Sequence, residues 1–114
     1  MPFIDVKTNK QVSKTEEIAL KQALGEAIAI LPGKSERWLM LGFEDGITMA
    51  FAGDMESPMA MVDVEIFGKA SDESYRKLTR AITDSVAESA GIAKDKIYVK
   101  YREVDVWGFD GENF

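Results

Sequence analysis

Pro2 is the residue of this chain whose position has the most direct chemical consequence. If Met1 is removed, as we expect before a small second residue, the Pro2 nitrogen becomes a secondary amine in a rigid ring. Model α-amino groups titrate near ~7.7–8.0, and burial or a nearby cation lowers that pKa further. A base with a pKa close to the working pH suits proton abstraction. The structural alternative is that Pro2 merely begins a strand, where a proline is tolerated.

The chain lacks two side chains on which many enzymes depend, because it contains no histidine and no cysteine. Thiolate nucleophiles, disulfides and thiolate metal sites are therefore excluded, and so are the usual Ser-His arrangements. Proton transfer in this protein would have to use a carboxylate, a lysine, a tyrosine or an amine terminus. We expect neither a metal site nor a cofactor.

Size and charge favour one domain over residues 1–114 and do not exclude a small anionic ligand. With 46% hydrophobic and 30% charged residues, the chain can fill a core. Its net charge of −6 argues against nucleic acid and anionic membranes as partners. No signal peptide and no membrane-spanning run is recognisable, so we expect a cytoplasmic protein, or one secreted without a signal peptide.

Apolar periodicity predicts the main elements of the fold. Strands are expected at residues 2–7, 37–44, 61–67 and 96–102. A first helix follows a capping box at Ser13-Lys14-Thr15-Glu16 and ends at or just before Leu31, ahead of Pro32. A second helix begins at Ser71 or Asp72 and ends at Gly91.

Three weaker elements are expected from turn signals. Asp45-Gly46 predicts a hairpin with a returning strand at residues 47–51. A short strand is predicted at residues 104–108, followed by a tail over 109–114.

The strong elements form a repeat, because strand, helix and strand recur at an offset of about sixty residues. Each strand–helix–strand unit gives a right-handed crossover between parallel strands. The expected fold class is α+β, with two βαβ units that form a four-stranded sheet and place both helices on one face.

The other face of that sheet has a mixed character. Charged residues expected there are interspersed with aromatic ones; they are Asp5, Asp63, Glu65, Lys100 and Arg102, with Phe3, Phe67 and Tyr98. Two interpretations stay open. The face is covered by self-association, or it is the solvated face of an α/β sandwich.

The order and spacing of several short segments resemble the macrophage migration inhibitory factor family of the tautomerase superfamily. The resemblance covers essentially all 114 residues. The segments that carry it are Met1-Pro2-Phe3-Ile4, Gly33-Lys34, Met49-Ala50-Phe51-Ala52-Gly53, Ile66-Phe67-Gly68-Lys69, Lys96-Ile97-Tyr98-Val99 and the tail from Trp107 to Phe114. Each segment alone is weak, and together they are specific.

The resemblance implies a homotrimer with a mixed sheet in each subunit and active sites between neighbouring subunits. It implies a keto–enol tautomerase of phenylpyruvate type, acting on a small aromatic 2-keto acid. Pro2 would be the catalytic base, and Lys34 would bind the substrate carboxylate or steady the enolate and lower the Pro2 pKa. Lys34 on its own would be interpreted as an exposed loop lysine.

Five further positions receive substrate-binding roles from the resemblance. The Phe67 backbone would help bind substrate, and Tyr98 would come from the adjacent subunit. Lys100 replaces the asparagine of better-known members and would add a cation near the pocket rim. Trp107 and Phe109 would wall the pocket. The alternatives for these aromatic residues are interface, sheet and tail packing.

Two other functions remain as alternatives. The first is a cytokine-like protein that binds a receptor, with incidental tautomerase activity. The second is hydration-based dehalogenation or decarboxylation, which requires extra arginines and a carboxylate that activates water. Of the four arginines, only Arg102 is expected close to the pocket. Thiol redox activity is excluded, because the stretch that carries Cys-x-x-Cys in some animal members is Met59-Ala60-Met61-Val62 here.

Overall fold

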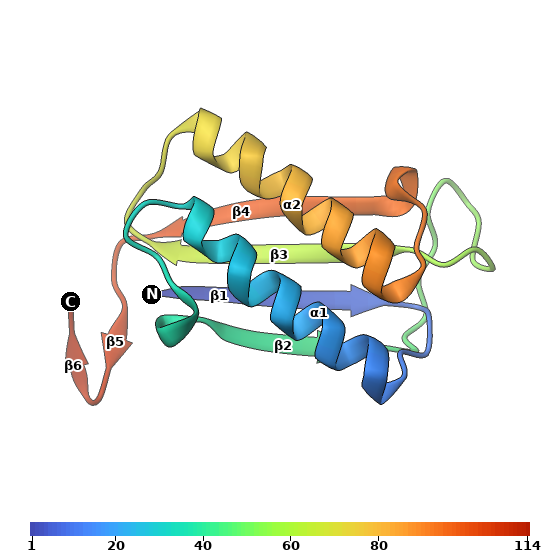
Figure 1. Ribbon diagram of the computed structural model, residues 1–114, viewed down its shortest axis with the longest axis horizontal. Helices are drawn as coiled ribbons and strands as arrows, with labels where there is room; N and C mark the ends of the chain where they lie inside the picture. The colour runs from blue at the N-terminus through green and yellow to red at the C-terminus, as the bar shows by residue number, and fades with distance from the viewer.

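The computed structural model describes residues 1–114 as a four-stranded sheet with two helices packed on one face (Figure 1). The main elements are β1 (Pro2–Thr8), α1 (Lys14–Ala27), β2 (Met40–Glu44), β3 (Ala60–Phe67), α2 (Asp72–Ala90) and β4 (Ile97–Val104). A small two-stranded sheet of β5 (Gly108–Phe109) and β6 (Glu112–Asn113) ends the chain. Short 3-10 turns lie at Ile28–Ile30, Glu36–Trp38 and Lys94–Lys96.

The strand order β2-β1-β3-β4 joins two βαβ units side by side. β1 and β2 are parallel, and so are β3 and β4, as the right-handed crossover predicts. β1 and β3 meet antiparallel at the centre, which makes the sheet mixed. The predicted fold class is therefore confirmed.

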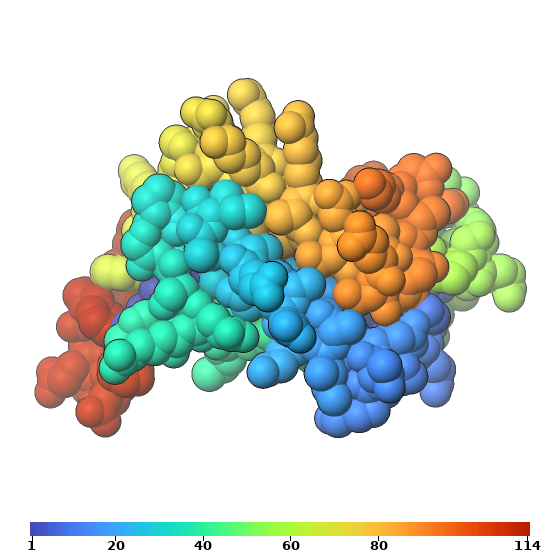
Figure 2. Space-filling view, in the orientation of Figure 1, coloured from blue at the N-terminus to red at the C-terminus, as the bar shows by residue number.

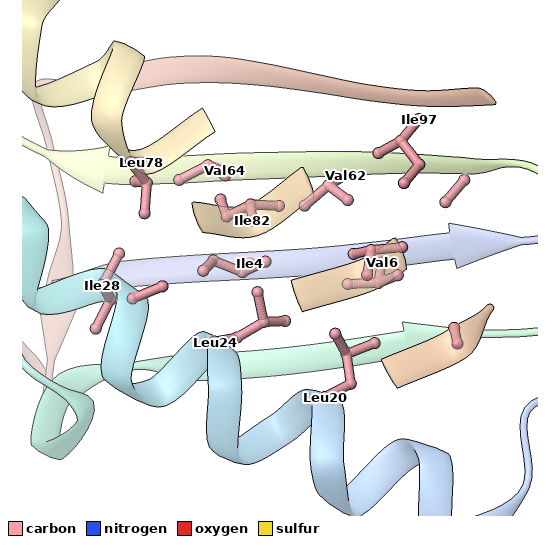
Figure 3. Close-up of a cluster of buried hydrophobic side chains, with 14 of the residues drawn as sticks. Ile4, Val6, Leu20, Leu24, Ile28, Val62, Val64, Leu78, Ile82 and Ile97 are labelled. Atoms are coloured by element: carbon pink, nitrogen blue, oxygen red, sulfur yellow. The ribbon is translucent and has the colours of Figure 1, made fainter. Parts of the chain in front are cut away.

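Alternating burial along the central strands places the core between the sheet and the helices (Figure 3). Ile4 and Val6 of β1 face Leu24 of α1 and Ile82 of α2, and all four side chains are buried. The period of two in the strands and of about 3.6 in the helices produces one continuous apolar layer. The intervening strand residues are left on the opposite face of the sheet.

The predicted helix boundaries agree with the structure. Ser13 caps α1 through a complete capping box with Glu16. Ser71 caps α2, and Gly91 ends that helix with φ of 68° in the left-handed region. After Ala27, α1 tightens into the turn Ile28–Ile30, which brings the chain to Pro32.

The predicted strand at residues 37–44 is correct only from Met40 onward. The backbone N–H groups of Trp38 and Leu39 donate to the backbone carbonyls of Ser35 and Glu36, respectively. Because these bonds close a 3-10 turn, Arg37 and Trp38 are not available to the sheet ladder.

The predicted hairpin at Asp45-Gly46 and its returning strand are wrong. The backbone N–H groups of Gly46 and Ile47 donate to the carbonyls of Lys10 and Thr8 instead. β2 already lies beside β1 at the sheet edge, so the chain crosses the end of β1 and continues to β3 on its other side.

The C-terminal prediction is also corrected. β4 continues to Val104, and the expected strand at residues 104–108 does not form. The tail folds into the β5–β6 hairpin, and both turn residues, Asp110 and Gly111, have positive φ. An Asp-Gly turn of this kind suits a two-residue hairpin loop.

Neither α1 nor α2 has the length and apolar character of a membrane-spanning helix.

Candidate active site

A cavity of about 910 Å³ opens at the end of the sheet where β1 begins. Three segments far apart in the sequence surround it: the N-terminus, the chain leading into β2, and the tail. Figure 2 shows the tail (red) beside the segment that leads into β2 (turquoise). The lining residues are Met1, Pro2, Phe3, Arg37, Trp38, Leu39, Met40, Leu41, Glu65, Trp107, Gly108 and Phe109.

Pro2 is fixed in this cavity by the register of the central strands. It is buried and lies opposite Ile66 in β3. The backbone N–H of Phe67 donates to the Met1 carbonyl over 3.0 Å. Because proline has no N–H, it can begin a strand without leaving a ladder donor unmatched. The chain terminus therefore has a defined position at the cavity.

Lys34 reaches the same place from the end of the first helical segment. Gly33 adopts φ of 79°, and the Lys34 backbone N–H donates to the Leu31 carbonyl over 3.0 Å. This turn directs the side chain toward β3, where Lys34 Nζ donates to the Phe67 carbonyl over 2.9 Å. The backbone of Phe67 thus contacts both groups: its N–H donates to Met1, and its carbonyl accepts from Lys34.

The α-amino group at this position has a pKa below its ordinary value. Burial is the larger cause, because it disfavours the charged form, and the neighbouring Lys34 adds electrostatic repulsion. The amine in the structure belongs to Met1.

Aromatic rings form the outer wall of the cavity. Trp38 and Phe109 meet edge to face, with ring centroids 5.3 Å apart. Phe114 packs against Phe67 at 5.8 Å and against Phe109 at 6.3 Å. Such pairs add to the stabilisation that burial alone provides. The tail is thereby attached to the body of the protein by its own aromatic residues.

The structure brings some of the sequence-predicted residues together and leaves two apart. Pro2, Trp107 and Phe109 line the cavity, while Lys34 and Phe67 bond to each other next to the N-terminus. Tyr98 and Lys100 do not line the cavity of their own subunit.

Tyr98 is the second residue of β4 and lies at the end of the sheet opposite to Pro2. The register partner of Tyr98 is Met61 in β3, and the centre of the Tyr98 ring lies 4.9 Å from that of Phe51. The residue is 57% exposed. Lys100 lies two residues further along β4, and its Nζ is 3.0 Å from a carboxylate oxygen of Asp63. Either residue could enter a site of this kind only from another subunit.

Lys100 belongs to a line of charges along the face of the sheet that the helices leave free. Lys7 Nζ lies 2.6 Å from Asp5 and 3.2 Å from Asp63. Asp5, followed by Asp63, raises the pKa of Lys7. Asp63 thus bridges Lys7 and Lys100, and the charges predicted for this face are on it.

Several cavity residues were missed from the sequence. The expectation that no arginine other than Arg102 lies near the pocket is wrong, because Arg37 lines the cavity. Its guanidinium carbon lies 5.1 Å from the centre of the Trp38 ring. The sequence pattern predicts a strand for Arg37 and Trp38, because an Arg-Trp dipeptide gives no signal for the 3-10 turn that the structure has there. Glu65 was placed on the free face of the sheet but not in the cavity.

Comparison with known proteins decides the family. The model of the macrophage migration inhibitory factor family matches residues 1–114. The chain belongs to this family. The resemblance deduced from the sequence is thereby confirmed, and no curated protein matches the chain.

Solved structures agree with that assignment. The crystal structure of Leishmania major MIF2 is 28% identical, covers 100% of this chain and 97% of its own, and gives a TM-score of 0.92. The macrophage migration inhibitory factor of Toxoplasma gondii is 20% identical, with 98% and 99% covered and a TM-score of 0.90. A fused 4-OT described as a symmetric trimer is 20% identical, with 97% and 94% covered and a TM-score of 0.87. The last two support the fold alone.

Proposed function

We propose that this protein is a keto–enol tautomerase of phenylpyruvate type that uses Pro2 as its general base after Met1 is removed. The observation that carries the proposal is the position of the N-terminus. Pro2 begins β1 inside a cavity of about 910 Å³, and Lys34 lies close enough to lower the pKa of an amine there. Membership of the tautomerase superfamily supports isomerase chemistry.

Removal of Met1 has two consequences at this site. The free amine becomes the ring nitrogen of Pro2, still in the environment that disfavours its charged form. The Phe67 N–H, which donates to the Met1 carbonyl, loses that acceptor. A substrate oxygen then replaces it, next to the Lys34 ammonium group on the Phe67 carbonyl.

The proposed reaction is a proton transfer between carbon and oxygen. The neutral Pro2 nitrogen takes a proton from C3 of the 2-keto acid. The C–H electron pair forms the C2=C3 double bond, and the carbonyl electron pair moves to oxygen. Lys34 stabilises the negative charge on that oxygen, which then takes a proton from solvent. The reverse sequence returns the proton to C3, and Trp107 and Phe109 contact the aryl ring.

We further propose a homotrimer in which neighbouring subunits complete each site. The similarity in fold to a 4-OT that is a symmetric trimer supports this assembly. So does the free face of the sheet, where charged residues alternate with Phe3 and Tyr98. In the trimer, Tyr98 and Lys100 of one subunit lie near Pro2 of the next.

A Pro2→Gly substitution tests the role of the ring nitrogen. The variant keeps an α-amine at the same place but loses the ring that orients it, and we expect kcat/KM for phenylpyruvate enol-to-keto conversion to fall by roughly 10²-fold, because a general base contributes only when it is positioned. Pro58→Gly is the matched control, because Pro58 is exposed in a loop remote from the cavity. Undiminished turnover in a folded Pro2→Gly protein would defeat the proposal.

A further inference from the structure

Arg37 is a cation in the cavity to which the tautomerase mechanism gives no role. Acidic residues outnumber basic ones by 20 to 14 in this chain. Even so, Arg37 takes part in none of the ion pairs. Its five N–H donors are therefore available to a ligand.

The guanidinium group has a defined position despite its exposure. It lies 5.1 Å from the centre of the Trp38 ring, within the distance of a cation–π contact. Trp38 is held in turn by the perpendicular ring of Phe109 at 5.3 Å. This chain of contacts keeps the positive charge at the cavity wall, so less conformational freedom is lost when it binds an anion.

Arg37 and Lys34 differ in position and exposure, because Arg37 lines the cavity and Lys34 lies beside it at the N-terminus. Lys34 is half-buried against Phe67, beside the N-terminus, whereas Arg37 is exposed. The cavity volume of about 910 Å³ is near the upper end of the ~300–1,000 Å³ typical of small-molecule sites. There is room for a ligand that reaches from the N-terminus to Arg37.

The remaining charge in the cavity lies on another wall. Glu65 belongs to β3, while Arg37 lies in the 3-10 turn three residues before β2, and β1 lies between these two strands. Two interstrand spacings amount to ~10 Å. Glu65 therefore disfavours an anionic group next to its own side chain, and Arg37 favours one at the β2 side of the cavity.

We propose that Arg37 is a specificity-determining residue that binds a second anionic group at the far end of the substrate. This inference rests on the proposed tautomerase function and makes its substrate class narrower. The preferred substrates are 2-keto acids with an additional carboxylate beyond the aryl or unsaturated part. Lys34 takes the 2-keto acid end, and Arg37 binds the distal carboxylate through its paired N–H groups.

The test compares phenylpyruvate with the same acid carrying a para-carboxylate. The Met1-free protein should show the higher kcat/KM with the para-carboxylate compound. In Arg37→Gln, we expect that preference to fall by about tenfold or more, mainly through KM, because a charge-assisted hydrogen bond is lost. Arg37→Lys should retain part of the preference. Arg76→Gln, on α2 outside the cavity, should leave it unchanged.

A binding measurement separates this inference from the proposed function. Calorimetry with 4-carboxyphenylacetate and phenylacetate reports the same preference without turnover. If neither keto acid is turned over but the binding preference falls in Arg37→Gln, the reaction is wrong and the anion site holds. A preference that is absent from the wild-type protein, or that survives intact in Arg37→Gln, overturns the role of Arg37.

Discussion

At the scale of single residues, the proposed chemistry depends on the protonation state of one amine. Burial and Lys34 both lower the pKa of the Met1 α-amino group, directly before β1, and we expect the same direction for the Pro2 amine once Met1 is removed. Below that pKa the amine is protonated and cannot accept a proton from substrate. A lowered pKa would therefore extend the proposed activity toward lower pH.

Lys34→Ala tests this dependence. Losing the cation should lower kcat/KM by roughly 10²-fold, because the enolate oxygen loses its charged partner. It should also raise the pKa of the amine, so the acid limb of the pH profile of kcat/KM shifts to higher pH. The loss will then be larger at pH 6 than at pH 9.

Lys69→Ala provides the control for that experiment. Lys69 is an exposed lysine two residues after Phe67, and it makes no contact with the cavity. Its profile should match the wild type. If the acid limb of Lys34→Ala keeps its position, Lys34 does not act on the amine.

At the scale of elements, local signals were reliable where the chain itself supplies the partners. The Ser13–Glu16 capping box and the Gly91 C-cap involve groups a few residues apart, so the sequence predicts them directly. The dipeptide Asp-Gly behaves differently in its two positions. At Asp110-Gly111 it forms the loop of a hairpin. At Asp45-Gly46 it does not, because the Gly46 N–H donates to the Lys10 carbonyl in the loop after β1.

Ser13→Ala measures what the capping box contributes. The substitution removes the acceptor for the Glu16 N–H at the start of α1, and we expect a loss of about 1 kcal/mol in the free energy of unfolding. Chemical denaturation followed by circular dichroism gives the value. Thr15→Ala, an exposed change in the same turn without a side-chain hydrogen bond, should cost far less. Equal losses in the two variants would show that the cap has no special role.

At the scale of the whole molecule, the sequence predicted the architecture but only part of the site. The periodicity of the strands and helices fixes two faces of the sheet, so the core and the charged face could both be foreseen. The cavity could not, because it forms where the N-terminus, the turn Glu36–Trp38 and the tail meet. The contact between Arg37 and Trp38 depends on that meeting and has no local signature.

The proposed assembly gives a prediction at this scale. Light scattering after size exclusion should give a mass of about 38 kDa, three times the 12.7 kDa of one chain. Tyr98→Ala should then lower tautomerase activity, although Tyr98 lies far from Pro2 in its own subunit. A monomer of full activity would contradict the shared site.

The most direct test of the whole account compares two preparations that differ only at the N-terminus. One begins at Pro2, and the other retains an extra residue that converts the Pro2 nitrogen into an amide; intact mass confirms each. With matched circular dichroism spectra, the account predicts phenylpyruvate turnover by the form that begins at Pro2 and a loss of at least 10²-fold in the extended form. Equal turnover by both would contradict it, since an amide nitrogen cannot act as the base.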